Sequence, residues 1–144
     1  MKLTKKNLNE VSLGTPLLAE GSYRVRLVKY EISVAKSGKD YLSLIFAIQD
    51  EEVIGYEDNK CYPNTNGDMT LFGGFSLGET ENYDPDTNLK RLATALGLEE
   101  LEEFGTEELD QAVAEQTELM VKVKHRPEEG EYRARNEVKS FYAA

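Results

Sequence analysis

The sequence is short of the residues on which many kinds of site depend. Its 144 residues include one cysteine (Cys61), one histidine (His125) and no tryptophan. A lone cysteine cannot build an internal disulfide framework. One cysteine and one histidine cannot supply the ligands of a Cys/His zinc site. We therefore predict a domain held together by an apolar core, with no metal ion, no cofactor and no catalytic residues.

Long apolar runs are also missing. No segment approaches the about 20 consecutive apolar residues of a membrane-spanning helix. The chain starts with basic residues, but Asn7, Asn9 and Glu10 follow where a signal peptide needs apolar ones. We therefore predict a cytoplasmic protein with no membrane contact. The length and the 40% hydrophobic content are typical of one globular domain.

Charge is distributed unevenly along the chain. The net charge is −10, and residues 50–118 hold 19 of the 27 Asp and Glu but only three of the 17 Lys and Arg. The segments 22–49 and 119–144 carry more basic than acidic residues. A cationic surface on an acidic chain indicates a polyanionic partner.

The segment Gly21 to Asp50 has the pattern of a long β-hairpin. Two runs rich in Val, Ile, Tyr and Phe flank a turn at residues 36–40. In the first run the apolar alternation changes parity after Leu27, which predicts a β-bulge.

The rest of the chain supplies three more strands and two helices. We expect a surface arm over residues 1–20 and a long acidic, turn-rich insertion over residues 50–68. Gly73 and Gly74 mark a bulge or a close backbone approach in the third strand. The further predicted elements are a third strand at Met69–Leu77, a helix opening at Asp84–Thr87 with Asp86 or Thr87 as its N-cap, a second helix after Thr106, and strands at Leu119–Arg126 and Glu131–Tyr142.

This order of elements predicts the fold. Five short strands, with helix between the third and fourth, have the element order of the OB-fold, a five-stranded Greek-key barrel. We therefore predict a mostly β protein: an OB-fold barrel at residues 21–144, preceded by the arm and carrying the acidic insertion between its second and third strands.

Basic and aromatic side chains on these strands are the candidate binding residues. Cations spaced two apart along a strand can follow a phosphate backbone, and aromatic rings between them can stack on bases. The candidate nucleic-acid-binding residues are Arg24, Arg26, Tyr30, Lys36, Lys39, Tyr41, Phe75, Lys122, Lys124, Arg126, Arg133, Arg135 and Lys139.

Several segments together resemble a known family. They are Glu20-Gly21-Ser22-Tyr23-Arg24-Val25, Ser37-Gly38-Lys39-Asp40-Tyr41-Leu42, Leu92-Ala93-Thr94-Ala95-Leu96-Gly97, Val121-Lys122-Val123-Lys124 and Tyr132-Arg133-Ala134-Arg135-Asn136-Glu137-Val138-Lys139. In their order and spacing the chain resembles small single-stranded DNA-binding proteins of bacteriophages, a family first catalogued as a domain of unknown function. The resemblance implies an OB-fold that coats single-stranded DNA during phage replication or recombination, without catalysis. We expect the protein to act in the host cytoplasm as a monomer or small homo-oligomer.

The sequence departs from many such proteins in the position of its acidic residues. Many replication-associated single-strand binders end in an acidic tail that recruits other proteins, whereas this chain ends Lys139-Ser140-Phe141-Tyr142-Ala143-Ala144. If replication or recombination proteins are recruited, we expect the internal acidic regions 50–68 and 99–118 to do it.

Two other classes of function are compatible with the residues. The acidic block 50–118 is the feature expected of a DNA mimic that occupies a host nuclease or polymerase. A nucleotide hydrolase would need clustered carboxylates, and Asp84 and Asp86 look instead like helix-cap residues. Binding to oligonucleotides separates the first alternative from single-strand binding.

Overall fold

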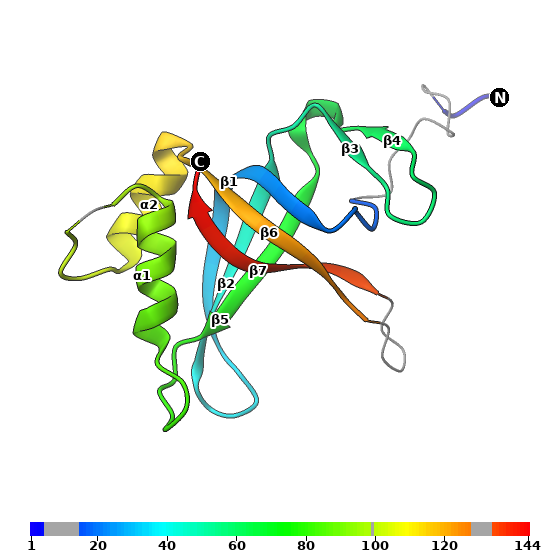
Figure 1. Cartoon of the computed structure of the whole chain (residues 1–144). Helices are drawn as coiled ribbons and strands as arrows, with labels where there is room; N and C mark the ends of the chain where they lie inside the picture. Colours follow the sequence, from blue (N-terminus) through cyan, green and yellow to red (C-terminus); the bar gives the residue numbers. More distant parts are fainter. Residues whose placement is uncertain (5–14, 99, 128–133) are drawn as a thin grey trace.

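The computed structural model describes residues 1–4, 15–98, 100–127 and 134–144. It is mostly β, with a five-stranded antiparallel sheet in the order β5-β2-β1-β6-β7 and a small β3-β4 sheet (Figure 1). The elements are β1 Gly21–Val34, β2 Asp40–Ile48, β3 Glu52–Ile54, β4 Cys61–Pro63, the 3-10 turn η2 Thr65–Gly67, β5 Thr70–Ser76, α1 Pro85–Ala95, α2 Thr106–Glu115, β6 Glu118–Arg126 and β7 Arg135–Ala143.

The predicted element order is confirmed. All five predicted strands belong to the main sheet, and both helices lie between β5 and β6, the third and fourth of these strands. Figure 1 shows the two helices together at one end of the sheet, away from the β3-β4 hairpin. The predicted last strand began at Glu131, and its first three residues lie outside the described part of the chain.

The predicted bulge in β1 is confirmed. The pairing of β1 with β2 shifts between Leu27 and Lys29. Before the shift Val25 and Leu27 are fully buried. After the shift, Tyr30 and the residues two apart from it point toward the core side of the sheet. Tyr30 itself lies opposite the buried Leu44 of β2. Because of the bulge, the first half of β1 packs into the interior of the sheet and the second half packs against α2.

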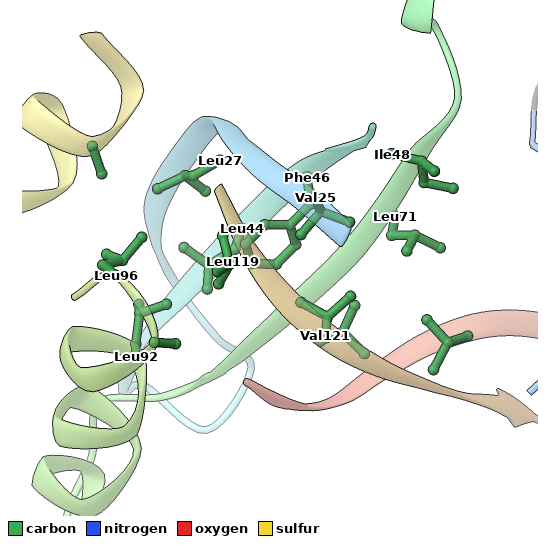
Figure 2. Close-up of a cluster of buried hydrophobic side chains, with 14 of the residues drawn as sticks. Val25, Leu27, Leu44, Phe46, Ile48, Leu71, Leu92, Leu96, Leu119 and Val121 are labelled. Atoms are coloured by element: carbon green, nitrogen blue, oxygen red, sulfur yellow. The ribbon is translucent and has the colours of Figure 1, made fainter. Parts of the chain in front are cut away.

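The core lies between the curled sheet and α1. Leu92 of α1 and its C-cap residue Leu96 belong to the same buried cluster as Leu44 and Leu119 of the sheet, and Figure 2 shows part of this cluster. Phe46 is the largest side chain that is fully buried. Within the described residues no polar or charged side chain is buried, so the interior is purely apolar. Burial of such side chains stabilises the fold by about 1.5–3 kcal/mol each.

The two edge strands approach each other and curl the sheet. They run parallel, because each is two antiparallel pairings away from β1. A Cβ atom on Gly73 of β5 would lie 3.1 Å from Val138 Cβ of β7 and 3.4 Å from Phe46 Cε2. The rings of Phe75 and Phe141 also meet across this gap, with centroids 6.4 Å apart. The close backbone approach predicted from the glycine pair is confirmed.

Residues 15–19, here called the N-terminal strap, connect these two edges. The Thr15 hydroxyl donates to Thr70 O (2.9 Å) and accepts from Thr70 N (2.8 Å) on β5. The Asn136 side chain of β7 donates to Pro16 O (2.8 Å) and accepts from Leu18 N (2.9 Å). Leu18 is fully buried in the core. The prediction of a surface arm up to residue 20 is therefore wrong for the strap.

The acidic insertion is more ordered than its composition predicts. It forms the β3-β4 hairpin, and Val53 of β3 is only 3% exposed. The Asn64 amide donates to Ile48 O (2.8 Å) and Asp50 O (2.9 Å), which anchors the insertion to the end of β2. Turn residues and charge suggested a loop, but one buried valine and one amide secure the hairpin.

The N-cap of helix α1 lies two residues before Asp86, the earlier of its two predicted N-caps. The Asp84 side chain accepts from Asp86 N at 3.0 Å, so Asp84 is the N-cap and Pro85 the first helical residue. Proline suits this position because its missing N–H is not needed there. Gly97, with φ of 78°, follows the C-cap Leu96, a position where a left-handed conformation favours glycine.

The strap predicts a measurable loss of stability. Asn136→Ala removes the partners of the Pro16 carbonyl and of the N–H of fully buried Leu18. We expect the free energy of unfolding to fall by about 1–3 kcal/mol, because unpaired buried polar groups keep their desolvation cost. Urea denaturation of both proteins measures the difference. Lys139→Ala, which removes only an exposed ion pair, is the control and should change stability by less than about 0.5 kcal/mol. Equal stability of Asn136→Ala and the unmodified chain would contradict this role of the strap.

Candidate nucleic-acid interface

A cleft of about 690 Å³ opens where β5 and β7 diverge. One wall is the outer face of β2 and β5, and the other is the start of β7 with the end of β6. The strap residues Thr15 and Leu17 lie at its border. The aromatic and charged side chains that line the cleft are Tyr41, Phe72, Arg126, Arg135 and Glu137.

Strand alternation places Tyr41 in this cleft. Leu42, Leu44 and Phe46 of β2 face the core, so Tyr41 and Ser43 face outward. Tyr41 lies opposite Ser76 of β5, and its ring extends toward Gly74, where a Cβ would lie 2.8 Å from Tyr41 Cε1. The glycine therefore leaves the space into which the edge of the tyrosine ring fits.

Phe72 is an exposed aromatic side chain that sequence reasoning missed. It lies on the outer face of β5 opposite Ile45, and 62% of it is exposed. Such exposure of a large apolar ring in a cleft is a typical feature of a binding site. The alternation within Leu71-Phe72-Gly73 carried the signal, because Leu71 and Phe72 must face opposite sides.

Phe75, predicted as a stacking residue, is a core residue instead. It lies opposite Leu42, is only 8% exposed and packs its ring against Phe141. Of the two phenylalanines on β5, strand parity turns Phe72 to solvent and Phe75 inward. A base cannot stack on a ring that is buried in this way.

Tyr30 also lies elsewhere than predicted. The bulge turns its side chain toward α2, where its hydroxyl donates to Asp110 Oδ1 at 2.6 Å. That hydrogen bond raises the pKa of Tyr30 above its ordinary value, with smaller contributions from desolvation and from the charge of Asp110. Tyr30 joins the sheet to α2 and does not line the cleft.

Two arginines supply positive charge on the opposite wall. Arg126 and Arg135 are paired directly across β6 and β7, and both are exposed. Neither lies within 4.0 Å of a carboxylate of the described residues. The charges on this wall act on Tyr41. Burial raises the pKa of Tyr41 most and Glu137 raises it next, whereas Arg126 and Arg135 lower it.

The backbone of β5 adds hydrogen-bonding groups. The odd-numbered residues from Met69 to Leu77 form the backbone hydrogen bonds to β2. At the two ends of this ladder, Ile48 N donates to Met69 O (2.9 Å) and Leu77 N donates to Asp40 O (2.8 Å). The N–H and C=O groups of Phe72 and Gly74 therefore face away from β2, toward the cleft. An extended ligand in the cleft meets donors and acceptors as well as rings and charges.

The other predicted cations lie in different places. Arg24, Arg26, Lys122 and Lys124 are on the outer face of β1 and β6, and Arg24 is 4.0 Å from Glu118. Lys36 lies in the turn between β1 and β2, while Lys39 lies near its end and its side chain packs over Gly78. Lys139 pairs with Glu137 at 3.1 Å. Arg133 lies outside the described residues. Of the predicted residues that the structure describes, Tyr41, Arg126 and Arg135 line the cleft.

The lone histidine has a structural contact. His125 Nε2 is 2.5 Å from Leu18 O, and its ring meets Tyr56 edge-on with centroids 4.2 Å apart. Within the described residues, no group of three His, Cys, Asp or Glu side chains could hold a metal ion. Neither helix that the structure describes is long and apolar enough to cross a membrane.

Fold and cleft together define a class: a curled five-stranded antiparallel β protein with an aromatic and cationic cleft beside its edge strands. The family model for DUF669, described as a protein of unknown function, matches residues 4–143, so the chain belongs to that family. Comparison with curated proteins gives no match.

The shifted pKa of Tyr41 predicts a pH dependence of stability. Its folded pKa is raised from 10.0, first by burial, so the fold favours the neutral ring. This contribution is complete below pH 10.0 and is lost as pH rises through the folded pKa. Tyr41→Phe cannot ionise, so it should lose less unfolding free energy between about pH 9 and pH 11 than the unmodified chain. Urea denaturation at both pH values measures this, and equal losses in the two proteins would contradict it.

Proposed function

We propose that this protein binds single-stranded DNA, without strong sequence preference, in the cleft between β5 and β7. The observation that carries the proposal is the placement of Tyr41 and the exposed Phe72 opposite Arg126 and Arg135. Stacking platforms beside a cationic wall are what sequence-tolerant single-strand binding needs.

The strand order supports an OB-fold interpretation of the sheet. In the order β5-β2-β1-β6-β7 the two edges run parallel and approach at Gly73 and Val138. Closing those edges gives a five-stranded Greek-key barrel with helix between its third and fourth strands. OB-folds commonly bind oligonucleotides on the face of their second and third strands, which here are β2 and β5.

The biological setting follows from the same proposal. We propose that the chain coats single-stranded DNA in phage replication or recombination, in the cytoplasm of the host cell, without catalysis. Among the described residues, the acidic segments 50–68 and 99–118 contribute no lining side chain to the cleft, so recruitment of replication or recombination proteins through their exposed carboxylates would leave the cleft free. The alternative function is a DNA mimic that uses this acidic block and leaves the cleft unoccupied.

Charge and stacking predict different binding signatures. Phe72→Ala should weaken oligo-dT binding by about 1–3 kcal/mol per stacked base, with the salt dependence almost unchanged. Replacing Arg126 and Arg135 together by Ala should weaken binding to every base composition. It should also flatten the slope of log K against log salt by up to about 0.7 per lost phosphate contact. Fluorescence anisotropy with labelled oligo-dT at several salt concentrations separates the two effects.

Matched controls come from the same chain. Tyr56 is an exposed aromatic on the acidic insertion and Arg91 an exposed cation on α1, so Tyr56→Ala and Arg91→Ala should bind as the unmodified chain does. If both cleft variants bind like these controls, the cleft is not the DNA site. If the unmodified protein fails to bind oligo-dT even at low salt, single-strand binding is wrong and the protein-interaction alternative replaces it.

A further inference from the structure

Tyr142, near the end of β7, lies on a face of the sheet away from the cleft. Its strand position is opposite Met120 of β6, yet its hydroxyl bonds to Ser22 Oγ of β1. Ser22 lies two strands away, a distance of about 10 Å at the usual strand spacing. The tyrosine side chain can span this only by lying across β6, between Met120 and Lys122.

One side of this ring is open to solvent. Tyr142 is 40% exposed although its hydroxyl is held by Ser22. A ring held across the sheet surface loses little further conformational freedom when a flat ligand covers it. Aromatic rings of this kind are the platforms on which nucleic-acid bases stack.

Positive charge surrounds the ring. Lys122 lies beside it on β6, and Arg24 on β1 is opposite Met120. Arg26 and Lys124 extend the same outer face along their strands. Glu118 and Glu137 lie among these cations, Glu20 bonds to the backbone of β6 nearby, and the Arg24–Glu118 pair at 4.0 Å is about half exposed. An exposed ion pair of this length is weak, so it competes poorly with a phosphate.

This platform is separate from the cleft. Tyr142 and Lys122 do not line the cleft, and Arg126, which does, lies six residues further along β6 than Met120. Six residues of strand span about 20 Å. A single strand bound in the cleft must leave it and cross the end of β6 to reach Tyr142.

We infer that Tyr142, Lys122 and Arg24 form a second contact for single-stranded DNA, in which one base stacks on Tyr142 and the cations hold neighbouring phosphates. The inference rests on the proposed function and extends the DNA path from the cleft onto the outer face of β1, β6 and β7. It therefore predicts an occluded length of DNA greater than the cleft alone accounts for.

Tryptophan reporters test the two sites independently, because the natural chain has no tryptophan. Phe72→Trp places a reporter in the cleft and Tyr142→Trp places one on the second platform. Oligo-dT of about 30 nucleotides exceeds the ~4–16 nucleotides that one OB-fold covers, so it can reach both places. The inference expects this DNA to quench the fluorescence of both variants at saturation. Quenching of Phe72→Trp with unchanged Tyr142→Trp emission would overturn it while leaving the proposed function standing.

A length comparison provides the second readout. Tyr142→Ala should bind oligo-dT of about 30 nucleotides about 5- to 150-fold more weakly, the effect of losing one stacked base. Oligo-dT of about six nucleotides, held by the cleft alone, should bind it almost unchanged. Tyr142→Phe keeps the ring without the bond to Ser22 and should retain most of the affinity.

Three outcomes would overturn the second contact. One is equal weakening of short and long DNA by Tyr142→Ala, which indicates a folding defect or a single site. Another is self-association in sedimentation velocity that Tyr142→Ala abolishes without affecting DNA binding, which assigns the face to a second copy of the chain. The third is a complete lack of oligo-dT binding by the unmodified protein, which removes the proposed function and this inference together.

Discussion

The contact of β5 with β7 at Gly73 is the constraint on which the rest of the structure depends. Because Gly73 has no side chain, Val138 of β7 can approach the backbone of β5 closely. The two edges of the sheet therefore meet there and the sheet curls. The curl encloses Phe46, whose ring packs on Phe141 with centroids 5.9 Å apart. Because interiors are packed as densely as organic crystals, a side chain at position 73 would force these partners apart.

The same geometry creates the cleft. Strands that meet at one point and are strongly twisted must diverge on either side of it. On one side the strap occupies part of the opening. Leu18 of the strap lies in the core, Thr15 bonds to the backbone of β5, and Asn136 of β7 bonds to the strap backbone. What remains open lies beside Phe72 and Gly74, whose backbone groups have no place in the β2 ladder. The site is thus a consequence of incomplete closure.

The charge distribution separates tasks between faces. The acidic residues concentrate on the insertion and around the helices, while the basic ones lie on β1, β6 and β7. Because the net charge is −10, the proposed binding of DNA would depend on these local cationic faces and on salt. Repulsion by the acidic side would then disfavour orientations in which DNA approaches from there.

The sequence by itself determined the five strands of the main sheet, the two helices and their order, because those depend on local properties, but it did not reveal the β3-β4 hairpin. Alternating apolar residues specified the five strands, the change of parity after Leu27 specified the bulge, and the glycine pair specified a close approach. The helix start was placed two residues late, since Asp84, Asp86 and Thr87 are all competent N-caps and only Pro85 at the first turn decides among them.

Tertiary structure alone decided which of these side chains form a site. Periodicity gave the two faces of β5 but not which one is covered, so Phe75 was chosen where Phe72 is exposed. The bulge moved Tyr30 to α2, and the register of β6 with β7 brought Arg126 beside Arg135. The strap and Tyr142 depend on contacts across more than 100 residues of chain, between Leu18 and Asn136 and between Ser22 and Tyr142. Such contacts leave no periodic signal, because they are fixed by how the sheet curls and not by neighbours in sequence.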